Sequence, residues 1–231
     1  MRVPRKAAVL MAAAAAACVA LSACGSVQMG AAAITGGSRI TSATLTNEVA
    51  NLNAAYKTDR ARQVSPQRPV GQETQQVLTW LILFRIYDKV AMQQRIYITP
   101  AQQAAQLTML NEAAHSNKVT LAEYVSVLAA VPPDLVSGKF GGQLSRYLAI
   151  QSVLASRLNG GKPVTTQAEQ AKVGPDLLHA QCVASKSLAI TVNPQFGRFD
   201  YASYSVVPAP PTLAANATAT KPASVKLTPP C

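Results

Sequence analysis

Side chains for catalysis and metal binding are scarce in this chain. Its 231 residues include 2 histidines, 4 cysteines, 1 tryptophan and 10 acidic residues. His115 and His179 fall in helix-forming stretches without an acid or a cysteine nucleophile at a matching spacing. His179 and Cys182 share a spacing of three, but a third metal ligand is not apparent. Glycine-rich nucleotide loops, a nucleophile elbow and paired catalytic carboxylates are also missing. The sequence predicts no enzyme, no cofactor and no metal site.

Acidic residues are outnumbered by 21 lysines and arginines, which gives a net charge of +11. Loss of Arg2, Arg5 and Lys6 with a signal peptide would leave 18 basic and 10 acidic residues, hence +8. No basic run or interleaved aromatics suggest nucleic acid, so no nucleic-acid partner is predicted. The excess favours anionic lipid headgroups, wall polymers or acidic clients. A generally solvated basic surface is the commoner explanation.

The beginning of the chain resembles an export signal. Three basic residues precede an uncharged Ala/Val/Leu run that ends at Ala23, and this pattern predicts a secretory signal. The run is shorter than the ~20 residues that span a bilayer. Leu21-Ser22-Ala23-Cys24 resembles the bacterial lipobox, in which the cysteine receives diacylglycerol and becomes the mature N-terminus. Cys18 lacks the large aliphatic residue three positions before it. We predict a lipid on Cys24; the alternative is an ordinary cleaved signal.

A lipid on Cys24 implies a bacterial protein anchored to the cell membrane. Its folded part would work at the extracytoplasmic face, in oxidising surroundings and without ATP. Cys18 would leave with the signal, so that Cys182 and Cys231 remain. Two cysteines in a secreted chain allow one disulfide, and we predict that it ties the last helix to the last residue. Two free thiols are the alternative.

The chain divides into four segments by composition. Residues 1–23 form the signal peptide, 24–30 a lipidated tether, 31–207 one helical domain, and 208–231 a Pro/Ala/Thr-rich tail. The tail is expected to lack structure unless Cys231 pins it. No internal repeat is evident, and the third segment is long enough for a domain with its own core.

Helical sequence dominates residues 42–187. The longest helix is predicted over residues 72–97, and another should begin near Pro133 and stop at Asn159-Gly160-Gly161. Gly174-Pro175 should kink or split the last helix. Three helix starts carry a capping box, in which a threonine caps the helix and Gln or Glu follows three residues later. These caps are Thr99, Thr120 and Thr166.

Strand-forming sequence brackets the helices. Residues 31–41 contain Gly36-Gly37 and predict a strand or small hairpin, whereas residues 188–206 are again β-branched and aromatic. Because a lone strand is unstable, we predict that the two segments pair, with Asn193-Pro194 starting a turn, Gly197 reversing the chain, and the nearby phenylalanines covering the sheet. A bare surface loop is the alternative. The predicted fold is mainly α, with a small sheet formed by N-terminal and C-terminal strand segments.

Three stretches resemble the SurA N-terminal, or SurA/PrsA-like, family of extracytoplasmic folding helpers. They are "AAAITGGSRITSATLTNEVANLN", "VLTWLILFRIYDKVAMQQRIYITPAQ" and "VNPQFGRFDY". Ile96-Tyr97-Ile98-Thr99 holds the position of the family's link into a capped helix, but Arg95 replaces the usual glycine and Gln102 the frequent glutamate. The resemblance implies a helical chaperone-type fold closed by strands from both ends. The parvulin-type isomerase domain that full-length members often carry has no room here.

The long helix is the first place to look for a binding surface. Apolar residues cover most of its circumference, and such a helix is usually buried by its neighbours. The alternative is that part of this surface stays open as a groove for unfolded segments. The candidate client-binding residues are Trp80, Leu83, Phe84, Tyr87 and Met92.

These observations predict a membrane-anchored lipoprotein with ATP-independent, chaperone-like binding of unfolded or exported polypeptides. The alternative is a non-catalytic structural or adaptor lipoprotein that binds one dedicated cell-envelope partner. A carrier of small ligands has no supporting polar constellation in this sequence.

Overall fold

The computed structural model describes residues 30–57, 71–137 and 142–209. Cys24, Cys231, the predicted signal peptide and the tail from residue 210 lie outside these ranges, so the predictions made for them stay predictions. The described helices are α2 (Ser42–Ala55), α4 (Glu73–Gln93), α5 (Pro100–Ser116), α6 (Leu121–Ala129), α7 (Asp134–Ser137), α8 (Gln143–Leu158) and α9 (Gln167–Ser187). The described strands are β1 (Ala31–Thr35), β2 (Ser38–Thr41), β3 (Thr191–Val192), β4 (Arg198–Asp200) and β5 (Ser205–Val207).

The strands from the two ends of the domain pair with each other, as the sequence predicted. β1 and β2 form an antiparallel hairpin across Gly36-Gly37, and β3 lies antiparallel on the other side of β1, with Ala33 opposite Val192. Asn193 extends this contact because its side-chain amide donates to the backbone oxygen of Ala31 at 3.1 Å. The mainly helical class with a small antiparallel sheet is therefore confirmed.

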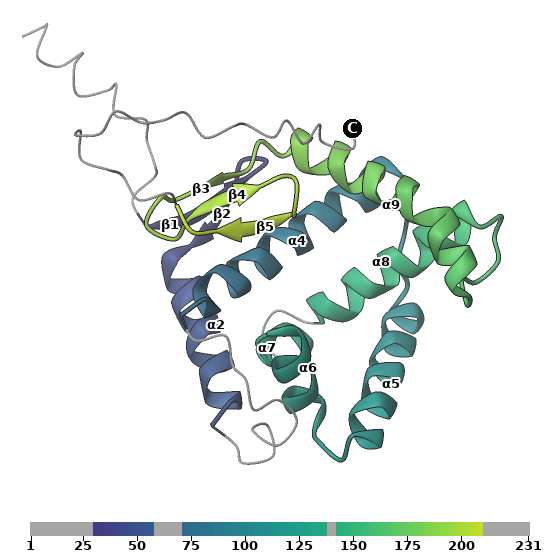
Figure 1. Ribbon diagram of the computed structural model, residues 1–231, viewed down its shortest axis with the longest axis horizontal. Coiled ribbons are helices and arrows are strands. Elements are labelled where there is room, and N and C mark those ends of the chain that lie inside the picture. Colours follow the sequence, from purple (N-terminus) through teal and green to yellow (C-terminus); the bar gives the residue numbers. More distant parts are fainter. Residues whose placement is uncertain (1–29, 58–70, 138–141, 210–231) are drawn as a thin grey trace, which may run out of the picture.

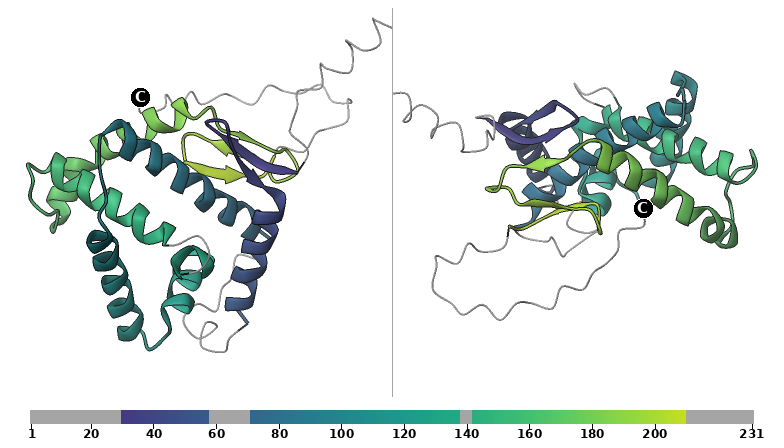
Figure 2. Two further views of the ribbon diagram at one scale, coloured as in Figure 1. Left: turned by 180° about the vertical axis from the view of Figure 1, so that it is seen from behind. Right: turned by 90° about the horizontal axis from the view of Figure 1, so that it is seen from above.

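The C-terminal strand segment contributes to two sheets rather than one. After β3 the backbone N–H of Phe196 donates to the Asn193 oxygen at 2.9 Å, which makes the predicted turn. Gly197 follows with φ +128°, and the chain then forms the β4–β5 ribbon. Phe199 of β4 belongs to the buried core, whereas Phe196 is half-buried against it. Both sheets lie at one end of the molecule, far from α5 (Figures 1 and 2).

Helix α4 is the centre of the fold. It crosses the middle of the molecule and contacts α2, α8, α9, β1 and β5 (Figure 1). Burial by these neighbours is the outcome expected for a helix that is apolar on most sides. One complete row at four-residue spacing is buried: Leu78, Ile82, Ile86 and Val90.

Helix α4 is shorter than predicted because its end is set by the backbone of Arg95. The helix stops at Gln93, four residues before the expected Tyr97, and Arg95 adopts φ +50°. This left-handed conformation commonly ends helices and favours glycine, so Arg95 adopts it at some cost in backbone strain. The guanidinium of Arg157 donates to the backbone oxygen of Gln94 at 2.9 Å and satisfies a carbonyl at the helix end.

All three predicted capping boxes are present. The hydroxyls of Thr99, Thr120 and Thr166 each accept a hydrogen bond from the backbone N–H three residues later. The side chain of that third residue accepts a bond from the cap's own backbone N–H in return. In the last box, backbone N–H groups of Thr165 and Thr166 hold the pKa of Glu169 down at about 2, so the box stays intact well into the acid range.

The cap of α9 gives a first testable prediction. Thr166→Ala removes the hydroxyl that accepts from the Glu169 backbone N–H at 3.2 Å. We expect the free energy of unfolding to fall by about 1 kcal/mol, measured by urea denaturation. Thr108→Ala, on the exposed surface within α5, is the control. It should cause no loss, because alanine is the better helix former there. Equal losses in both variants would contradict a capping effect.

The last helix is not split at Gly174-Pro175, contrary to one of the two expected outcomes. α9 runs unbroken from Gln167 to Ser187 with Pro175 inside it. Proline removes one N–H and crowds the preceding turn. Packing against α4 and α8 holds the helix together despite this cost. The helix expected from Pro133 divides into α7 and α8, with residues 138–141 between them outside the described ranges, and ends at Leu158 before Asn159.

Candidate functional site

The structure separates the five candidate client-binding residues. Phe84 and Tyr87 are only 5% and 4% exposed, Trp80 and Leu83 are half-buried, and Met92 is 66% exposed. Phe84 and Tyr87 therefore belong to the core and are not accessible to a client in this conformation. The candidate surface narrows to Trp80 and Leu83, and Met92 lies apart from them.

The buried aromatic residues form a cluster completed by Tyr147 of α8, which the sequence analysis did not single out. The Tyr147 ring lies 5.6 Å from Trp80, 5.8 Å from Phe84 and 4.6 Å from Tyr87, between ring centres. The side-chain amide of Gln151 donates to the hydroxyls of Tyr87 and Tyr147, each at 2.9 Å. Burial, and to a smaller extent the neighbouring Tyr87, raises the pKa of Tyr147. The cluster is a neutral packing element that fixes α8 against α4.

A groove lies beside the exposed edge of this cluster. Its volume is about 590 Å³, and Trp80 and Leu83 form part of its wall. The indole N–H of Trp80 donates to the backbone oxygen of Ala129 at 2.7 Å, so the ring is held in place at the C-terminal end of α6. Further apolar walls come from α6 and β5: Val127, Leu128, Val206 and Val207.

Polar side chains at the start of α4 line one end of the groove. Gln72, Gln75 and Gln76 all line it. The side-chain oxygen of Gln75 is buried and accepts no hydrogen bond, so a buried acceptor is left without a partner beside the groove. Leaving such an oxygen without a partner costs about 1–3 kcal/mol.

The strand β5 closes one side of the groove, but its outer edge is blocked. The backbone N–H of Val206 points away from β4 and donates to the hydroxyl of Thr79 at 2.8 Å. The Thr79 hydroxyl donates in turn to the Gln75 backbone oxygen at 2.7 Å. Pro208, the next residue with this orientation, has no N–H to offer. A strand added by a ligand would therefore lack donors, and binding here depends on side chains.

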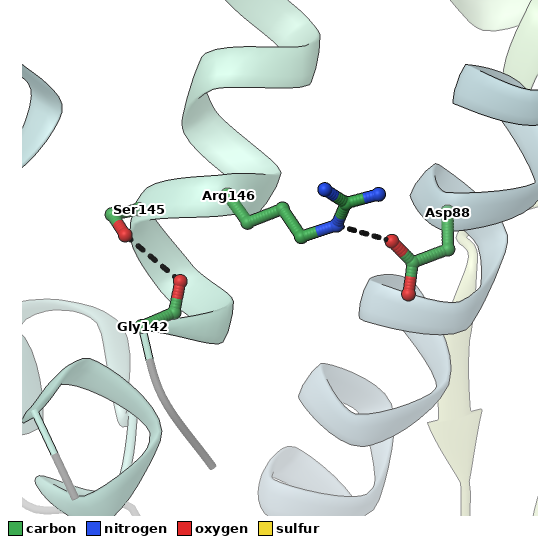
Figure 3. Close-up of polar contacts among 4 residues, drawn as sticks. All are labelled: Asp88, Gly142, Ser145 and Arg146. Carbon is green, nitrogen blue, oxygen red and sulfur yellow. Dashed lines mark hydrogen bonds and ion pairs between the residues drawn. The ribbon is translucent and has the colours of Figure 1, made fainter. Parts of the chain in front are cut away.

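A second hollow lies further along α4, beside Met92. It has a volume of about 320 Å³ and is lined by Arg85, Asp88 and Lys89 as well as the β1–β2 hairpin and the end of α9. Asp88 is engaged elsewhere, because its carboxylate accepts from the guanidinium of Arg146 at 2.8 Å (Figure 3). Figure 3 also shows the Ser145 hydroxyl donating to the Gly142 oxygen at 2.8 Å, at the start of α8.

A buried carboxyl group on α2 is the other feature that the sequence analysis missed. Glu48 is 2% exposed, and one of its carboxyl oxygens has no hydrogen-bond partner. Burial raises the pKa of Glu48, the nearby Asp134 carboxylate raises it further, and a hydrogen bond from Asn51 opposes both effects. The Asn51 amide also donates to Asp134 at 3.0 Å. This acid is a local cost to the fold rather than part of the groove.

In residues 30–57, 71–137 and 142–209, no three of His, Cys, Asp and Glu gather as metal ligands would. None of the helices in those ranges has the length and apolar character needed to cross a bilayer. Cys182 is completely buried in α9, and because Cys231 lies outside these ranges, the Cys182–Cys231 disulfide remains a prediction.

Comparisons of the chain with protein-family models, with curated proteins and with solved structures find no match. The resemblance to the SurA/PrsA-like folding helpers therefore rests on the three sequence stretches alone.

Proposed function

We propose that this protein binds unfolded or exported polypeptides without ATP, in a chaperone-like manner, as a lipoprotein held at the extracytoplasmic face of the membrane through Cys24. The observation that carries the proposal is the groove of about 590 Å³ beside the half-buried Trp80 and Leu83. Its walls are mainly apolar, with glutamine side chains at one end, and such a lining suits a polypeptide segment better than a small polar metabolite.

The walls favour short apolar segments of a client. Leu128 is 57% exposed at the groove and can gain burial on binding. Covering ~200–400 Å² of apolar client surface at ~25 cal/mol per Å² gives roughly 5–10 kcal/mol before the cost of association. The net affinity is then weak, and clients are released without an energy source.

The test compares two exposed apolar residues of similar size. Leu128→Gln changes the groove, whereas Met109→Gln changes α5, where the side chain is 53% exposed. We expect the mature protein to suppress aggregation of a reduced, unfolding model protein at near-stoichiometric amounts, followed by light scattering. Leu128→Gln should raise the amount needed about tenfold, the loss expected when one leucine is no longer buried. Met109→Gln should behave as the wild type.

The outcomes separate the proposal from its alternative. Suppression that is equally sensitive to both substitutions would place binding outside the groove. No suppression of several unrelated clients would favour the adaptor, and a pull-down from an envelope extract with wild type and Leu128→Gln would then show whether one native partner depends on the groove.

A further inference from the structure

Helix α4 exposes a second, basic surface at its C-terminal half. We define this basic face by Arg85, Lys89 and Met92. Arg85 is exposed, Lys89 is half-exposed and Met92 is 66% exposed. The three residues follow at spacings of four and three, so they lie in one row on the helix surface. A large apolar side chain thus protrudes beside two cations.

The charge of this face is not cancelled locally. Among the residues that the structure describes, Asp88 is the only acidic one that lines the hollow there, and its carboxylate is held by Arg146 at 2.8 Å. The rest of the wall comes from the β1–β2 hairpin and the end of α9: Thr35, Gly36, Ser38, Ser187 and the largely buried Leu188. The surface therefore combines positive charge, hydroxyl groups and one exposed thioether.

We propose that the basic face docks on a bilayer surface rich in anionic phospholipid. Arg85 and Lys89 would contact headgroup phosphates, and Met92 would enter the boundary between headgroups and acyl chains. The positive charge favours an anionic surface over a neutral one. The protruding methionine favours a bilayer over a soluble anion, because only the bilayer offers an apolar region for the side chain to enter. This contact is separate from a lipid on Cys24 and does not require the chaperone-like activity.

Docking through the basic face also determines which way the groove faces relative to the membrane. Lys89 follows Trp80 by nine residues, or about two and a half helical turns, so the two side chains leave α4 on opposite sides. The groove lies beside the N-terminal half of α4, and the basic face lies on its C-terminal half. A domain lying on the membrane through the basic face holds Trp80 away from it.

Partitioning onto vesicles tests the docking surface. The mature chain from residue 24 with Cys24→Ser carries no lipid and retains every described residue. We expect it to co-sediment with vesicles of phosphatidylglycerol and phosphatidylcholine in equal parts, and not with phosphatidylcholine alone. Each cation near an anionic surface contributes about fivefold, so Arg85→Gln/Lys89→Gln should lower partitioning roughly 25-fold. Met92→Ser should lower it further.

A matched pair of lysines controls for net charge. Lys162 and Lys172 line a different hollow, between the end of α8 and the start of α9. Lys162→Gln/Lys172→Gln removes the same charge and should change partitioning less than about twofold if the basic face is the contact. Equal losses in the two double variants, or equal binding to neutral vesicles, would overturn the proposal.

The orientation has its own readout because Trp80 is the only tryptophan in the chain. With brominated phosphatidylglycerol in the vesicles, its fluorescence should remain unquenched. In Trp80→Phe/Met92→Trp, the reporter moves to the basic face and should be quenched. Quenching of Trp80 together with an unquenched Trp at position 92 would place the opposite side of α4 on the bilayer and refute the assignment.

Discussion

Gly197→Ala is expected to unfold the C-terminal ribbon or to destabilise the whole domain by about 2–5 kcal/mol. Gly197 has φ +128°, a conformation that residues with a side chain rarely adopt at a cost of about 1–3 kcal/mol. An added Cβ would also collide with the backbone oxygen of Val207 and lie 3.1 Å from a methyl group of Val206. The colliding oxygen belongs to the strand paired with β4, so it cannot move without breaking the ribbon.

Gly37→Ala separates the cost of a positive φ from the cost of the collision between the added Cβ and β5. Gly37 also has positive φ, +82°, but a Cβ there meets nothing within 4 Å. This substitution should cost only about 1 kcal/mol, measured with Gly197→Ala by thermal and urea unfolding. If the two variants lose the same stability, the close approach to β5 contributes nothing and the structure of the turn is wrong.

Glu48→Gln is expected to stabilise the protein by about 1–3 kcal/mol at neutral pH. Glu48 is buried, it faces the Asp134 carboxylate, and one of its oxygens has no partner. A neutral amide of the same shape removes the repulsion and the cost of burying a charge, and it keeps an acceptor for Asn51. Glu112→Gln, on the exposed surface of α5, makes the same charge change and should alter stability by less than about 0.5 kcal/mol.

The pH dependence of the stabilisation by Glu48→Gln shows whether the charge of Glu48 is its cause. Because the folded state raises the pKa of Glu48 above 4.5, the folded protein binds this proton more tightly than the unfolded chain. Its contribution to stability is therefore present below pH 4.5 and is lost as the pH rises through the raised pKa. The advantage of Glu48→Gln should be small at pH 4 and grow towards pH 7. An advantage that is constant across this range would point to packing instead of charge.

Features with a local cause were predictable from the sequence. The three capping boxes appear at Thr99, Thr120 and Thr166 because a helix start is decided within four residues. The hairpin at Gly36-Gly37 follows from the same kind of local rule. The pairing of both ends needed one further argument, that an isolated strand is unstable, and it was correct.

The side chains that distant elements bury or leave exposed were not predictable. Nothing in residues 72–97 shows that α8 and α9 cover Phe84 and Tyr87 while Trp80 and Leu83 stay at a groove. Tyr147 enters the aromatic cluster from a helix about 60 residues away in the chain. Glu48 stands in a polar stretch, and its burial follows only from the position of α2 against its neighbours. Two of the five candidate residues, Trp80 and Leu83, were therefore correctly placed at the groove in advance.

The β1–β3 pairing also determines when, during synthesis, the three-stranded sheet can be completed. Ala33 is among the first described residues to be made, yet its partner Val192 follows 159 residues later. At the usual rate of about 5–20 residues per second, that delay is roughly 8–30 s. Throughout this interval one edge of β1 has no strand beside it, and an unpaired edge invites contacts with other chains. The nascent chain is thus itself in need of protection until its last strands are made.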